Sequence, residues 1–161
     1  ISPEDYHVIT QEVLPKRAIL RAMNLLKERS YTRHQLEQKL KDSLYAQSDI
    51  DHAIAYVESY GYIDDLQYAL DFITYRASQL SRRQIEQKLM QKGIDDRIIR
   101  QAFQSFCDDG NAIEEEQQIR TFLRKKNYYD LEDEKQRQKV VAALLRKGYR
   151  FEQIQTVLRG Q

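Results

Sequence analysis

Cysteine, proline and glycine are all scarce in this chain, and each shortage excludes certain folds or sites. The single cysteine, Cys107, excludes an internal disulfide and a zinc site built from several cysteines. Five glycines and two prolines among 161 residues leave little material for the many turns of a β fold. The sequence also lacks an apolar run long enough to span a membrane or to form a signal peptide. We therefore expect a helical, cytoplasmic protein.

The charges are unevenly distributed along the chain, and two stretches lack basic residues, although the net charge is only +1. Residues 1–15 carry three acids and no base, and residues 108–118 carry five acids and no base. By contrast, residues 16–41 carry eight bases against two acids, and residues 119–161 carry eleven against five, so each stretch has a balance of +6. Such segregation permits a basic face that the net charge hides.

The first residues are typical of the start of a helix. Ser2 predicts an N-cap, Pro3 suits the first helical position, and Glu4 adds an early acid. Because the chain begins with Ile1 instead of methionine, we expect a fragment or a processed form of a longer protein.

Most of the chain repeats itself. Residues 32–40 align with residues 81–89 at a shift of 49, and six of the nine positions are identical. A third copy follows at a shift of 55 from the second, with about five residues inserted around residues 128–133. Apolar residues keep a helical period within the copies, as in the stripe formed by Ala18, Ala22, Leu25 and Leu26. Small units bury little surface alone, so neighbouring copies are expected to share buried surface.

This pattern predicts an all-α protein of three tandem three-helix repeats in an elongated, curved array, with an extra N-terminal helix. The predicted segments are an N-terminal helix (1–15), repeat one (16–61), repeat two (62–110) and repeat three (111–161).

Helix ends are marked by capping residues. Capping boxes or close relatives of them are predicted at the start of each middle helix, in Thr32-x-x-Gln35, Ser81-x-x-Gln84 and Asp133-x-x-Gln136. Two middle helices are predicted to end at a left-handed glycine, Gly93 or Gly148, whereas the first repeat has Leu44 there, so a different turn is expected. Further predicted caps are Ser48, Asp64 and Asp95, and further predicted helix ends are Gly61 and Gly160.

Residue types that often act in catalysis or metal binding have structural explanations in this sequence. Asp64 and Asp65 are adjacent acids that could bind a metal, but a helix cap accounts for both, and we favour capping. Tyr62 and Tyr68 are expected to pack, and Cys107 is expected to be a small buried residue. The three histidines lie far apart, and no glycine-rich phosphate loop occurs. We therefore predict no catalytic residue, no metal and no cofactor.

One long motif resembles a known family. Gly61-Tyr62-Ile63-Asp64-Asp65-x-x-Tyr68-Ala69 is followed by Ser81-Arg82-Arg83-Gln84-Ile85 and, after Leu89, by Lys92-Gly93-Ile94. This order resembles the pattern of the RecX family, as does Lys147-Gly148-Tyr149 in the third repeat. The motif residues that we expect to act mainly in structure are Gly61, Tyr62, Asp64, Asp65, Tyr68, Ala69, Gly93 and Gly148. An acidic stretch at residues 108–116 departs from the family pattern and would interrupt a continuous basic path.

The resemblance implies a partner and not a reaction. RecX proteins bind the RecA recombinase and its filament on single-stranded DNA, and mostly restrain recombinase, ATPase and coprotease activity in DNA repair, homologous recombination and the SOS response. Some members also bind DNA, and longer members carry an additional N-terminal segment. The resemblance therefore implies RecA, or its filament, as the partner of this chain, with possible direct DNA contact, no membrane and a monomeric state.

Basic residues recur in equivalent helices of the repeats, which suggests a shared contact face. The predicted partner-binding residues are Arg76, Arg82, Arg83, Lys88, Lys92, Arg120, Arg124, Lys125, Lys126, Arg146, Lys147 and Arg150. Each one alone is typical of a solvated surface charge. Because acids such as Glu37 lie among the basic residues, the mixture fits a protein partner with an acidic groove better than bare DNA.

Three functions stay open at this point. The first is a non-enzymatic regulator of RecA, as the resemblance implies. The second is a direct single-stranded nucleic-acid binder that uses the basic third repeat. The third is a helical scaffold for another protein, which the repeat alone supports equally. An enzyme is the class that we expect least, because no nucleophile, base and orienting residue combine in the sequence.

Overall fold

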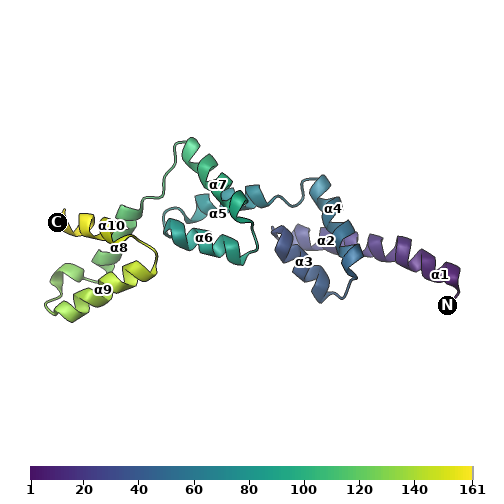
Figure 1. Cartoon of the computed structure of the whole chain (residues 1–161), viewed down its shortest axis with the longest axis horizontal. Coiled ribbons are helices and arrows are strands. Elements are labelled where there is room, and N and C mark those ends of the chain that lie inside the picture. Colours follow the sequence, from purple (N-terminus) through teal and green to yellow (C-terminus); the bar gives the residue numbers. More distant parts are fainter. Residues whose placement is uncertain (161) are drawn as a thin grey trace. The chain divides into compact units, whose positions relative to one another are not determined.

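The computed structural model describes residues 1–160, and their regular structure is entirely helical (Figure 1). The elements in chain order are α1 (Pro3–Val8), η1 (Ile9–Val13), α2 (Leu14–Glu28), α3 (Arg33–Asp42), α4 (Gln47–Ser59), α5 (Asp65–Arg76), α6 (Arg82–Gln91), α7 (Asp96–Asp108), α8 (Glu115–Lys125), η2 (Tyr128–Asp130), α9 (Glu134–Arg146) and α10 (Phe151–Arg159). Helices α2–α4, α5–α7 and α8–α10 form three successive groups. The predicted all-α repeat fold with an N-terminal helix is confirmed.

The contacts of the chain fall into two compact units. The first unit consists of residues 1–69 and 90–99, and the second consists of residues 70–89 and 100–161. Residues of the second repeat contribute to both units. The exact boundaries of the three repeats stay a prediction.

The N-terminal helix runs directly into the first repeat. Ser2 caps α1 as predicted, because its hydroxyl accepts a hydrogen bond of 3.0 Å from the amide of Asp5. Helices α1 and α2 are joined by the π-helical turn η1, in which the amide of Leu14 donates to the carbonyl of Ile9, five residues back. Pro15 follows at once and explains the wider turn, because its ring lacks an N–H and would collide with the preceding helical carbonyl. Figure 1 shows α1 continuing into α2 without a break.

Helices α2, α3 and α4 enclose the core of the first unit (Figure 1). Ala18 and Ala22 on α2 and Ala53 on α4 are fully buried, and such short side chains allow α2 and α4 to pack closely. The larger core residues Leu36, Leu40, Ile50, Ile54 and Val57 are also fully buried. Each of them stabilises the fold by about 1.5–3 kcal/mol relative to an exposed position.

Helices α8, α9 and α10 enclose a separate core in the second unit. Its buried members are Ile119, Leu123, Leu144, Tyr149, Ile154 and Val157. The predicted insertion before α9 forms the short 3₁₀ helix η2 and lengthens α9 to 13 residues, against 10 in α3. Asp133 caps α9 as predicted, although its carboxylate accepts from the amide of Lys135 and not from that of Gln136, so the cap is a relative of the capping box.

Most predicted caps are confirmed. The Thr32 and Gln35 side chains form a reciprocal box at α3, and the Ser81 and Gln84 side chains form one at α6. Asp64 accepts from the amide of Gln67, and Asp95 accepts from that of Arg97. Gly61, Gly93 and Gly148 have φ values of +70°, +82° and +94°.

Gly160 ends α10 as predicted, with an ordinary φ of −77°. Three expectations are wrong. Helix α4 begins at Gln47 with Ala46 as its N-cap, two residues before the predicted cap Ser48. Cys107 is exposed, because it lies just off the buried stripe formed by Ile99, Ala102, Phe103 and Phe106.

The turn at Leu44 is the third, because it matches its glycine counterparts instead of differing from them. Leu44 adopts a left-handed φ of 66°, and the amide of Tyr45 donates to the carbonyl of Leu40. In the third repeat the amide of Tyr149 donates to the carbonyl of Leu144 in the same way. The leucine is 92% exposed, so no packing compensates for its strained backbone.

Candidate partner-binding surface

The first repeat junction joins Thr32 and Gln35 at the start of α3 to Lys92 and Gly93 at the end of α6. The Thr32 hydroxyl accepts from the amide of Gln35 and donates a 2.6 Å hydrogen bond to the carbonyl of Lys92. One buried hydroxyl therefore caps its own helix and also satisfies a carbonyl of the following repeat. Gly93 fits here because a Cβ at this position would overlap the side chain of His34.

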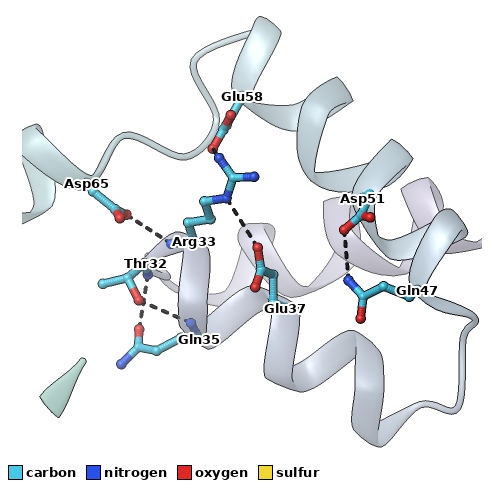
Figure 2. A network of polar contacts seen from close by, with 8 residues as sticks. All are labelled: Thr32, Arg33, Gln35, Glu37, Gln47, Asp51, Glu58 and Asp65. Carbon is cyan, nitrogen blue, oxygen red and sulfur yellow. Dashed lines mark hydrogen bonds and ion pairs between the residues drawn. The ribbon is translucent and has the colours of Figure 1, made fainter. Parts of the chain in front are cut away.

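Charged side chains surround the first junction (Figure 2). The Arg33 guanidinium binds Glu37 at 3.2 Å and Glu58 at 2.9 Å, and the Arg33 amide donates to the Asp65 carboxylate at 2.9 Å. Figure 2 shows these carboxylates converging on Arg33 from three directions. They raise the pKa of Arg33, mostly through the hydrogen bond that Arg33 donates to Glu37, while half-burial raises the pKa of the Asp65 carboxyl.

The second repeat junction has the same design. The Ser81 hydroxyl caps α6 and donates to the carbonyl of Lys147, just before Gly148. A Cβ on Gly148 would lie 2.7 Å from the Cβ of Arg83, the residue that matches His34 in the repeat. Arg82, the match of Arg33, binds Glu86 at 3.1 Å and also stacks on the ring of Phe103, 4.4 Å from its centroid.

Several predicted partner-binding residues are thus engaged inside the fold. Arg82 and Arg83 belong to the second junction, Lys92 contributes its carbonyl to the first, and its ammonium lies 5.9 Å from the ring of Tyr68. Arg120 pairs with Glu116 on the same helix at 3.5 Å. Further examples are Arg76, whose guanidinium binds Gln79, and Arg150, whose charge partly offsets the burial that raises the pKa of Glu115.

The other half of the predicted set makes no ion pair within residues 1–160, although the carbonyl of Lys147 belongs to the second junction as that of Lys92 belongs to the first. None of the salt bridges within residues 1–160 involves Lys88, Arg124, Lys125, Lys126, Arg146 or Lys147. Three of these residues gather near Phe122 at the end of α8, and we call Lys125, Lys126 and Lys147 the lysine cluster. The ammonium of Lys126 lies 5.6 Å from the Phe122 ring centroid, and that of Lys147 lies 5.1 Å from it.

A groove of about 700 Å³ in the second unit adjoins the lysine cluster, and we refer to it as the α8 groove. Phe106, Phe122 and Tyr149 supply apolar surface, while Lys125 and Lys147 bring in positive charge. The buried Gln118 fixes the lining: its amide donates to the carbonyl of Ala77 at 2.8 Å, and its oxygen accepts from the Tyr149 hydroxyl at 2.6 Å. Burial raises the pKa of Tyr149 to about 12.

Most of the motif residues stabilise the fold. Asp64 and Asp65 both bond to helix-start amides, and Ala69 is fully buried. Tyr62, expected to pack, is instead 49% exposed, and its ring stacks on Tyr60 at 5.7 Å. Among residues 1–160, no group of three or more histidine, cysteine or carboxylate side chains is placed to hold a metal.

Sequence reasoning missed two features of this surface. Tyr60 and Tyr62 form an exposed stacked pair, and the ring of Tyr56 lies tilted against Tyr60, an i, i+4 contact at the end of α4 that the spacing signals only in part. The bridging by Gln118 could not be found, because its partners Ala77 and Tyr149 are 41 and 31 residues away along the chain.

Three-helix groups joined by a repeated hydroxyl-to-carbonyl junction define a tandem helical-repeat protein. Family models described as the first, second and third three-helix domains of RecX match residues 18–56, 64–102 and 114–158. The regulatory protein RecX of Vibrio vulnificus (strain CMCP6) is 30% identical over 141 residues, which cover 87% of this chain and 90% of that protein. This chain belongs to the RecX family, and its function is regulatory.

Other relatives agree with this assignment. The regulatory protein RecX of Caldanaerobacter subterraneus subsp. tengcongensis is 28% identical over 159 residues, which cover 98% of this chain and 77% of that protein. The crystal structure of RecX from Lactobacillus salivarius has the same fold, with a TM-score of 0.72 at 21% identity over 91% of this chain and 96% of that one. No helix within residues 1–160 has the length and apolar character needed to cross a membrane.

Proposed function

We propose that this chain is a non-enzymatic regulator that binds the RecA recombinase or its filament on single-stranded DNA and restrains recombinase, ATPase and coprotease activity. Membership of the RecX family carries the proposal, since the relatives are named regulatory proteins. The protein acts as a binder, and its effect on the filament requires no catalytic step of its own.

The uncompensated basic residues are the proposed anchors. Lys88, Arg124, Lys125, Lys126, Arg146 and Lys147 lack an ion-pair partner within residues 1–160, so their charges are available to an acidic surface. Arg82 is a weaker candidate than its charge suggests, because its guanidinium already binds Glu86 and lies over Phe103, whereas Arg83 approaches Gly148 only with its side-chain carbons. Charges of this kind at the rim of a protein interface typically raise the rate at which the two proteins associate.

The proposal is tested by the rate of ATP hydrolysis by RecA on single-stranded DNA while this chain is titrated from well below equimolar. Inhibition that saturates below one chain per RecA subunit is expected if the chain acts on a filament. An unchanged rate at every ratio, with a helical circular dichroism spectrum, would refute the proposal.

A matched pair of variants locates the contact. The variant K88Q/R124Q/K125Q/R146Q removes four of the proposed anchors, and inhibition should weaken about tenfold or more, which corresponds to ~1.4 kcal/mol. The control variant K16Q/R17Q/R21Q/K27Q removes the same charge from exposed positions of α2 and should inhibit like the wild type. Equal loss in both variants would point to a general effect of net charge.

Direct binding of single-stranded DNA is a second candidate function. The exposed rings of Tyr56, Tyr60 and Tyr62 favour it, because bases stack on such rings regardless of sequence. This function predicts binding to an oligonucleotide without RecA that weakens steeply with salt and on Tyr60→Ala. The absence of such binding at low salt would remove the candidate.

A further inference from the structure

We propose that the α8 groove is the docking site for an acidic and partly apolar peptide segment of the protein partner. The inference rests on the proposed function and names the chemistry of one contact within it. The groove has about 700 Å³ of space, which is ample for a few side chains of an extended segment.

The lysine cluster determines the charge of the occupant. Lys126 and Lys147 both lie within 6 Å of the Phe122 ring centroid, and Lys125 lines the same groove as Phe122 and Lys147. No salt bridge within residues 1–160 involves any of the three ammonium groups. An anionic group bound in the groove is therefore attracted by Lys125 and Lys147 in its lining and by Lys126 at the same ring.

The lining of the groove distinguishes a peptide from a nucleic acid. Phe106, Phe122 and Tyr149 offer apolar surface, which suits an aliphatic or aromatic side chain next to the anionic one. A single strand would need cations along its whole backbone. The lining instead includes Glu114 as well as Lys125 and Lys147, so the positive charge is not continuous.

The groove is also held open by the fold. Gln118 bonds to the carbonyl of Ala77 and to the hydroxyl of Tyr149, while the carbonyl of Lys147 is bound by Ser81. These bonds fix the apolar lining and one of the lysines before any partner arrives. A preformed site of this kind loses little conformational entropy on binding.

Two substitutions separate the shape of the groove from its charge. Thr121→Trp fills the groove without changing charge, because Thr121 lies on its wall and bonds only to the carbonyl of Gln117 in its own helix. Thr156→Trp is the matched control, because Thr156 is also exposed and makes the same bond to Glu152 on α10. For charge, K125Q/K147Q is compared with K135Q/K139Q, which removes two exposed lysines of α9 outside the groove.

The measurement is the dissociation constant for RecA filaments on single-stranded DNA, obtained by fluorescence anisotropy with the chain labelled at its N-terminus. We expect Thr121→Trp and K125Q/K147Q each to weaken binding about tenfold or more, with both controls close to the wild type. Each variant is first checked for wild-type helicity and unfolding midpoint.

Other results would overturn the inference in recognisable ways. Wild-type affinity in Thr121→Trp, with or without weakening in K125Q/K147Q, would show that no segment enters the groove, while the proposed function would stand. A loss of binding to a bare thymidine oligonucleotide in Thr121→Trp would assign the groove to nucleic acid. If the wild type itself fails to bind the filament, the proposed function falls, and the inference falls with it.

Discussion

The hydroxyl of Ser81 donates a hydrogen bond to the carbonyl of Lys147, which lies 66 residues further along the chain. The hydroxyl of Thr32 does the same with the carbonyl of Lys92, 60 residues away. In both cases the hydroxyl also caps a helix, and a glycine follows the accepting lysine. The Lys-Gly and Ser/Thr-x-x-Gln elements of the sequence are therefore two sides of one repeat junction.

Replacing Ser81 by alanine should destabilise the protein by about 2–4 kcal/mol. The change removes a helix cap, worth about 1 kcal/mol, and leaves a carbonyl without its donor, which costs a further ~1–3 kcal/mol if buried. Ser81→Thr should be nearly neutral, because Thr32 fills the equivalent position. Asp95→Ala removes a cap that lacks a bond to a following repeat and should cost about 1 kcal/mol. Urea unfolding measures all three, and equal losses for Ser81→Ala and Asp95→Ala would contradict the junction.

Replacing Gly148 by alanine should cost more than replacing Gly110. Both glycines have positive φ values, +94° and +84°, so both substitutions carry a backbone strain of about 1 kcal/mol. Only the alanine at position 148 would also press against the Cβ of Arg83, whereas Gly110 faces open space. We expect an additional loss of ~1–3 kcal/mol for Gly148→Ala in the free energy of unfolding. A similar cost at both positions would mean that the neighbouring repeat moves aside without penalty.

Replacing Leu44 by glycine should stabilise the protein by about 0.5–1 kcal/mol. Leu44 holds a left-handed φ of 66° while its side chain is 92% exposed, so glycine relieves strain and gives up almost no packing. The control is Leu20→Gly within α2, where glycine should cost about 1 kcal/mol. A lower thermal midpoint for Leu44→Gly than for the wild type would contradict this reading of the turn.

Tyr149→Phe should change how stability responds to alkaline pH. Burial raises the pKa of Tyr149 to about 12, whereas an unfolded tyrosine titrates near pH 10. Between these values the unfolded chain loses the proton first, so the unfolding free energy from this group falls as pH rises from about 10 to about 12. At pH 8 Tyr149→Phe should be less stable than the wild type, because Gln118 loses its hydrogen bond.

That difference should shrink towards pH 12, because only the wild type carries the tyrosine penalty. Denaturation by guanidinium at pH 8, 10 and 11.5 checks it. A constant gap between wild type and Tyr149→Phe would show that the hydroxyl titrates normally.

Local patterns in the sequence predicted much of the fold. Capping at Thr32, Ser81 and Asp64 depends on side chains within three residues of a helix start, so spacing alone revealed it. The left-handed turn at Leu44 was missed because leucine disfavours that conformation and only the surrounding fold imposes it. The outward position of Cys107 was visible in the stripe that ends at Phe106, one residue earlier.

The candidate surface was less predictable. From the sequence alone, the basic residues of the predicted set could not be ranked. The structure distinguishes them, because Arg82 and Arg83 lie at the second junction, whereas Lys125 and Lys126 make no salt bridge within residues 1–160. The α8 groove could not be foreseen, since it joins residues as far apart as Thr74 and Tyr149. Both features arise from tertiary contacts between distant segments.

The most direct test of the central claim is co-sedimentation of this chain with RecA filaments and with bare single-stranded DNA across a range of potassium chloride concentrations. A regulator that contacts the recombinase is predicted to bind the filament saturably at near-physiological salt, where bare DNA retains little of it. Equal retention on bare DNA, or none on the filament at any salt, would contradict the account.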